Sequence, residues 1–198
     1  DSEQYPRVMS LLRRVSCGDR LTADDVVWLQ TEAEDCWTEE LQRAWHAIEA
    51  EVLAREWERS HDPWNAINAS SHWRKAAKPT SALGLTNEAL AKAGSDAKAR
   101  SALLTTRGGA LRDLSNLDEA KAMGLEAHAL TPKDFRPCTL LGAVHIELGD
   151  LMGGREWYLK AEKLGADRHS IDQDLRALLS RTSRSQRQRI IEFLIEHD

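Results

Sequence analysis

The chain has 198 residues, of which 41% are hydrophobic and 30% charged, and its formal net charge is −5. This length suffices for one large domain or two small ones with a buried core, and the composition is that of an ordinary globular protein. The apolar runs are shorter than the ~20 residues of a membrane helix, and no segment has the pattern of a signal peptide. We therefore expect no membrane partner.

The cysteines and the first residue indicate a setting for the chain. Cys17, Cys36 and Cys138 are widely spaced, and no CxxC pair is present. This usage predicts reduced thiols in a cytoplasmic protein, each filling a small apolar gap. The sequence begins at Asp1 without a methionine, which we interpret as the start of a domain excised from a longer chain.

Helix-forming residues dominate, and no sustained alternation indicates a strand, so we expect an all-α fold. Residues 4–16 predict a first short helix, and Thr22, three positions before Asp25, resembles a capping box that begins a second. From Trp37 apolar residues recur at steps of three and four, which predicts a long helix to about Arg59. Pro63 suits the first turn of a further helix.

Six of the seven tryptophans lie between Trp28 and Trp73. A cluster this dense suits either a ligand cage or a hydrophobic core, and the helical spacing favours the core.

From residue 63 the sequence repeats. Gly108 and Gly142 are 34 positions apart, as are Ala127 and Ala161, whereas Ser70 precedes Gly108 by 38. Each unit reads as a helix, a short polar turn and a second helix with small residues seven apart. Because seven residues make about two turns, these small residues share one face, where the paired helix approaches closely. We therefore interpret Gly108 as a helix-packing residue, because no strand precedes it and no phosphate-binding GxxxxGK[ST] is present.

Residues 63–168 resemble three tetratricopeptide repeats (TPR), a family of 34-residue helix-turn-helix units. The residues that carry the resemblance are Ser70, Trp73, Ala82 and Ala89 in the first unit, Gly108, Leu111, Ala120, Ala127 and Pro132 in the second, and Leu141, Gly142, Gly149, Asp150, Tyr158 and Ala161 in the third. Gly124 and Gly154 depart from the family pattern. The resemblance implies a TPR-like superhelical solenoid. Residues 1–62 are then a Trp-rich helical segment that packs on or caps it, and residues 169–198 are capping helices.

In such a solenoid the first helix of each pair lines a concave groove. The register places there Trp64, Asn68, Ser71, Arg74 and Lys75 from the first unit, Thr105, Thr106 and Arg112 from the second, and Arg136, Thr139 and Glu147 from the third. This face is more basic than acidic, and its Asn and Arg side chains are directional donors. We expect a protein-interaction module that binds a segment of a partner protein, with a preference for an acidic one, and no catalytic residues, cofactor or metal. A second interpretation stays open, in which Arg74 and Arg112 pair with Asp113 and Glu147 inside the groove, which leaves no strong preference for an acidic partner.

Two other classes of function remain as alternatives. Residues 66–112 hold eight basic residues against two acidic ones, and five arginines lie between Arg176 and Arg189. These stretches suit a nucleic-acid-contacting accessory domain of a larger enzyme, although the negative net charge argues against it. The second alternative is an enzyme with its site in the Trp-rich N-terminal third.

Two groups of residues contain part of a metal-ligand set. His145 and Glu147 form an H-x-E that lacks the P-C-x-x-C of zinc deaminases. His61, Asp62 and His72 lack a further residue that completes a ligand set.

Overall fold

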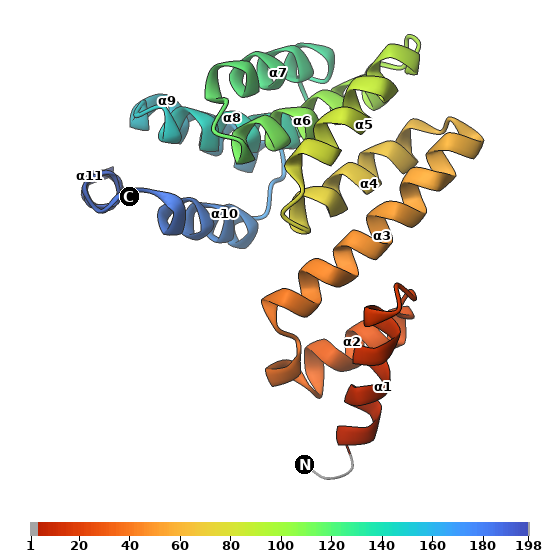
Figure 1. Cartoon of the computed structure of the whole chain (residues 1–198). Helices are drawn as coiled ribbons and strands as arrows, with labels where there is room; N and C mark the ends of the chain where they lie inside the picture. Colours follow the sequence, from red (N-terminus) through yellow and green to blue (C-terminus); the bar gives the residue numbers. More distant parts are fainter. Residues whose placement is uncertain (1–3, 198) are drawn as a thin grey trace. The chain divides into compact units, whose positions relative to one another are not determined.

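The computed structural model describes residues 4–197, and the chain forms two compact units, unit 1 (Asp1–Lys92) and unit 2 (Ala93–Asp198). Within the described residues every regular element is a helix, which confirms the predicted all-α class (Figure 1). No helix in this part of the chain is both long and apolar enough to cross a membrane.

Unit 1 contains α1 (Tyr5–Ser16), α2 (Ala23–Thr31), a 3₁₀ turn η1 (Glu34–Cys36), α3 (Glu39–Ser60), α4 (Pro63–Lys75) and α5 (Pro79–Lys92). The predicted helix starts are confirmed. Thr22 and Asp25 form a reciprocal capping box at α2, and Pro63 lies in the first turn of α4. The predicted boundary after residue 62 falls between α3 and α4, which pack against each other within this unit.

The N-terminal core of unit 1 joins α1, α2 and α3. Its buried members are Val8, Leu11, Val15, Leu21, Leu29, Ala33 and Leu41, and Trp28, Trp37 and Trp45 pack against them. Trp57, later on α3, is fully buried, whereas Trp64 on α4 is 38% exposed. Most of the tryptophans are therefore packing residues, as their helical spacing favours.

Unit 2 contains α6 (Ala97–Asp113), α7 (Leu117–Leu130), α8 (Phe135–Glu147), α9 (Leu151–Lys163), α10 (Arg168–Arg181) and α11 (Arg184–His197). Helices α6 and α7 pack along each other, as do α8 and α9, and α8 also contacts both α6 and α7 (Figure 1). The breaks between α6 and α7 and between α8 and α9 fall at residues 114–116 and 148–150, where the sequence predicts the short polar turn of a unit.

The three helix pairs share one turn. Ala77, Ser115 and Gly149 have φ values of 58°, 61° and 89°, in the left-handed region. In each case the amide of this residue bonds the carbonyl three positions back, and the next amide bonds the one five back. This is the Schellman arrangement that ends a helix, and it also ends α1 at Gly18 and α9 at Gly165. The three turns within the pairs are 38 and 34 positions apart, which is the spacing of the predicted units.

Gly108 lies at a close packing contact between helices. A Cβ built on it would lie 2.5 Å from Cδ2 of Leu140 and 3.2 Å from the carbonyl oxygen of Ala120. A Cβ on Gly142 would lie 2.8 Å from the ring of Tyr158. Both contacts confirm that these glycines are packing residues. The sequence did not reveal the part of Leu140, which comes from the next pair and enters the space beside Gly108.

The C-terminal helices cover one side of α8. The backbone of α10 packs more extensively on α8 than on its chain neighbour α9 (Figure 1). Ile171 and Leu178 of α10 and Ile190 of α11 are buried in one cluster with Ala143 and Ile146 of α8. These helices therefore occupy part of the surface on which the sequence places the groove.

Candidate partner-binding face

The predicted site residues of unit 2 lie on the first helices of two pairs, α6 and α8, which contact each other side by side. Asp96 caps the first turn of α6, and Asp134 caps that of α8 by accepting the amide of Arg136 at 2.9 Å. We call the surface of these two helices that carries Thr105, Arg112, Arg136, Thr139 and Glu147 the α6–α8 face. It has an open end and a covered end.

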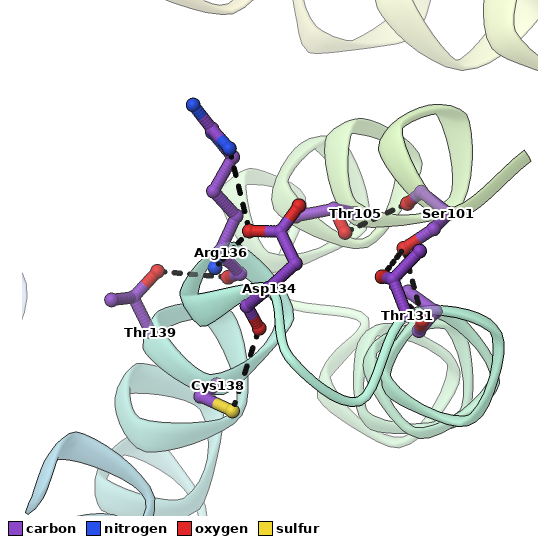
Figure 2. A network of polar contacts seen from close by, with 8 residues as sticks. Ser101, Thr105, Thr131, Asp134, Arg136, Cys138 and Thr139 are labelled. Carbon is purple, nitrogen blue, oxygen red and sulfur yellow. Dashed lines mark hydrogen bonds and ion pairs between the residues drawn. The ribbon is translucent and has the colours of Figure 1, made fainter. Parts of the chain in front are cut away.

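Figure 2 shows the open end, where Thr105, Arg136 and Thr139 lie. The hydroxyl of Thr105 donates to the carbonyl of Ser101 at 2.8 Å, and that of Thr139 donates to the carbonyl of Arg136 at 2.8 Å. Both hydroxyl oxygens keep lone pairs with which to accept a further bond. The Arg136 side chain is 67% exposed, although one nitrogen lies 3.3 Å from Asp134 Oδ1. The open end can therefore offer a cation and two hydroxyl groups to a ligand.

Beside the open end, a network of hydrogen bonds joins α6 to the end of α7 (Figure 2). The Ser101 hydroxyl donates to the carbonyl of Ala127 at 2.9 Å and lies 2.6 Å from the Thr131 hydroxyl. These bonds fix the start of α6 to the end of α7. Thr106, which the sequence places in the groove, is buried instead, and its hydroxyl donates to the carbonyl of Ala102. The structure thus removes Thr106 from the surface.

The covered end is organised around Arg112, whose side chain is only 8% exposed. Its Nε lies 3.0 Å from Oε1 of Glu147 as an ion pair, and its Nη1 donates to Oδ1 of Asp174 at 3.1 Å. The Tyr158 hydroxyl donates to the other oxygen of Asp174 at 2.7 Å. The pairing of Arg112 with Glu147, which is one part of the second interpretation of the sequence, is confirmed. The contact with Asp174 on α10 was not foreseen.

Charge at the covered end is balanced by these contacts. Burial by itself lowers the pKa of the Arg112 guanidinium, but the carboxylates of Asp174 and Glu147 outweigh burial and raise this pKa above its usual value. Burial, reinforced by Asp174, raises the pKa of the Tyr158 hydroxyl, which stays protonated as a donor. Near by, Asp113 pairs with Arg181 of α10 at 3.3 Å. Arg112 therefore already holds a carboxylate ligand from its own chain.

The predicted site residues of unit 1 form a stripe on α4. Trp64, Asn68, Ser71 and Lys75 follow one another at steps of four, three and four, so they share one side of the helix. Trp64, Asn68 and Lys75 are exposed, whereas Ser71 and Arg74 are half-buried.

The residues considered as metal ligands are separated. His72 on α4 meets His46 on α3, with 2.9 Å between their Nδ1 atoms, while Asp62 caps α4 by accepting the amide of Trp64. His145 is buried in the third pair and bonded through Nδ1 to Asp150 at 2.7 Å. Among residues 4–197 no group of three histidine, cysteine or acidic side chains is placed to hold a metal ion.

The three cysteines lie in different surroundings. Cys138 is buried in the core of unit 2, where burial raises the pKa of its thiol, and Cys36 packs beside the N-terminal core. Both fit the prediction of gap-filling thiols. Cys17 is exposed at the end of α1, so the prediction is wrong for this residue.

Two contacts at these sites join residues that the sequence does not connect. Asp174 meets Arg112 across 62 positions, and His72 meets His46 across 26. Neither separation follows a helical period or the 34-residue repeat, so no local signal pointed to them. Comparison with known proteins matched no family model and found no similar curated protein.

Proposed function

We propose that the chain is a helical-repeat interaction module of the tetratricopeptide type, which binds a segment of a partner protein along the first helices of its pairs. Binding, not catalysis, is its proposed role, in a reducing cytoplasmic setting that suits three free thiols. The common turn of the three pairs and the glycine contacts of Gly108 and Gly142 support the repeat architecture.

The observation that carries the proposal is that Arg112 binds an acidic residue of its own chain. Its guanidinium, on a first helix, binds the carboxylate of Asp174, while Ile171 and Leu178 of the same α10 helix are buried nearby. The α6–α8 face thus accepts a helical segment with an acidic residue when that segment comes from its own chain. At the open end, Arg136 and the two threonine hydroxyls supply donors and acceptors of the kind that bind a peptide carboxylate or backbone.

The proposal is tested by partner capture with matched variants. Arg136→Glu reverses the charge at the open end, and Lys163→Glu makes the same change at the end of α9, a second helix. We expect a captured partner to bind Arg136→Glu about tenfold more weakly, since like charges at an interface repel, and Lys163→Glu as tightly as the wild-type chain. Equal binding by both variants contradicts the proposal.

Five exposed arginines favour a second candidate function. Arg176, Arg181, Arg184, Arg187 and Arg189 all lie at the surface around the break between α10 and α11. Such a group can contact nucleic-acid phosphates, which keeps the accessory-domain alternative open. If it binds nucleic acid, the affinity for a DNA or RNA oligonucleotide falls steeply as salt rises, and Arg184→Gln with Arg189→Gln flattens that dependence. If the two changes leave the affinity for the oligonucleotide unaltered, the nucleic-acid candidate is ruled out.

A further inference from the structure

Helix α10 presents a short pattern to the α6–α8 face. Ile171, Asp174 and Leu178 are separated by three and four positions, so they lie on one side of the helix. Ile171 and Leu178 are buried beside Ala143 and Ile146, and Asp174 between them accepts hydrogen bonds from Arg112 and Tyr158. The pattern is an acid flanked by two branched aliphatic residues on an amphipathic helix.

Helix α10 lies against the first helix of the last pair. Helix α8 packs on both helices of the pair before it, α6 and α7. Helix α10 approaches α8 on the side that also carries Ala143 and Glu147, and its Asp174 accepts a hydrogen bond from Tyr158 of α9. It therefore lies across first-helix residues, where a partner segment is proposed to bind.

The packing of the two C-terminal helices leaves space. A partly open cavity of about 110 Å³ lies between α9, α10 and α11, lined mainly by apolar side chains that include Leu159, Leu175 and Phe193. A smaller one of about 60 Å³ lies beside Ile190. Interiors are normally close-packed, and the atoms that line a void lose contacts and stabilisation. The packing of α10 and α11 is therefore incomplete at these two places.

We infer that α10 is a built-in ligand of the α6–α8 face, and that the partner is an amphipathic helix with the same pattern, an acidic residue flanked by branched aliphatic residues three positions before it and four after it. The partner helix displaces α10, its acid takes the place of Asp174 on Arg112, and its aliphatic residues cover Ala143 and Ile146. This inference rests on the proposed function and adds the chemistry and helical form of the partner.

A synthetic fluorescein-labelled peptide of residues 168–182 serves as the probe for this exchange, with anisotropy as the readout. The full wild-type chain binds it weakly, because its own α10 competes at high local concentration. Leu178→Ala in the full chain weakens that competitor and leaves α6 and α8 unchanged. We expect it to bind the peptide about tenfold more tightly, since the open fraction rises.

Two matched peptides test the acid itself. Asp174→Asn in the peptide removes the charge that meets Arg112, and we expect about tenfold weaker binding to the Leu178→Ala chain. Asp172→Asn removes an equivalent charge from the exposed side of the same helix and leaves binding unchanged. Equal affinities for these two peptides, or no gain on Leu178→Ala, overturn the inference.

Hydrogen exchange on the wild-type chain covers the case in which Leu178→Ala fails to fold. The amides of α10 are expected to exchange faster than those of α8, because α10 opens without the rest of unit 2. Equal protection of α10 and α8 overturns the inference. Its failure is separable from that of the proposed function, because Arg136→Glu acts at the open end of the face, away from Arg112 and α10.

Discussion

Nδ1 of His46 on α3 lies 2.9 Å from Nδ1 of His72 on α4, so one ring donates a hydrogen bond and the ring that accepts it is uncharged. Trp45 lies against both imidazoles, at 4.4 Å and 5.7 Å between ring centroids. Burial, then His72 and Lys75, lower the pKa of His46 to about 4, against an opposing effect of Glu49. Burial and Lys75 also lower the pKa of His72, again opposed by Glu49.

This pair makes unit 1 sensitive to acid. In the unfolded chain these histidines take up protons near pH 6.5, whereas in the folded chain His46 does so only near pH 4. Between these values the unfolded state binds more protons, so the free energy of unfolding falls as pH falls. Urea unfolding at pH 7 and pH 5 measures this loss, and we expect His46→Gln to show less of it. His169→Gln, at an exposed histidine, keeps the full loss; an equal loss in all three proteins refutes the assignment.

Among the residues of the α6–α8 face, Arg112 is the one whose removal is expected to lower the free energy of unfolding most. Arg112→Met leaves the carboxylates of Glu147 and Asp174 without their cation in a largely buried place. We expect the free energy of unfolding to fall by about 2–4 kcal/mol, moderated by the partial exposure of Asp174. Arg181→Met removes an exposed partner of Asp113 and is expected to cost about 0–1 kcal/mol. Urea titration followed by circular dichroism compares the two, and similar losses contradict the buried role of Arg112.

Gly108 and Gly84 form a matched pair for the packing argument. Gly108→Ala places a methyl group against Leu140 and the Ala120 carbonyl, and we expect destabilisation by about 1–3 kcal/mol. Gly84 is also helical, on α5, and a Cβ there meets nothing within 4 Å. Gly84→Ala is therefore expected to stabilise the chain by about 0.5–1 kcal/mol through helix propensity alone. Thermal melting distinguishes them, and a gain in both variants shows that Gly108 is not tightly packed.

The shared turn predicts that exchanging alanine and glycine has opposite effects on stability at Ala77 and Gly149. Ala77 has a φ of 58°, a conformation that favours glycine over alanine. We expect Ala77→Gly to raise the free energy of unfolding by about 1 kcal/mol. Gly149 has the same role in the third pair at φ 89°, and Gly149→Ala is expected to lower it by a similar amount. Changes of the same sign in chemical denaturation experiments contradict the equivalence of the two turns.

The sequence by itself determined the helices, their ends and the period of the pairs. Thr22 with Asp25, and Pro63, act on backbone groups within one helical turn, so their effects follow from spacing alone. Gly108 and Gly142 recur because each pair meets the same steric condition, and repetition makes that condition visible in one chain. The face that carries Arg136 and Thr139 follows from the same register, since the side of a helix is fixed by 3.6 residues per turn.

Only the tertiary structure decided which end of the α6–α8 face stays open and which is covered. Arg112 has the same appearance in the sequence as Arg136, yet α10 covers one and leaves the other at the surface. The direction of α10 depends on the turn after α9 and on contacts of Ile171 and Leu178 with residues tens of positions earlier. The meeting of His46 with His72 likewise depends on how α4 packs on α3. Such pairings come from the packing of whole helices, and no local rule of spacing contains them.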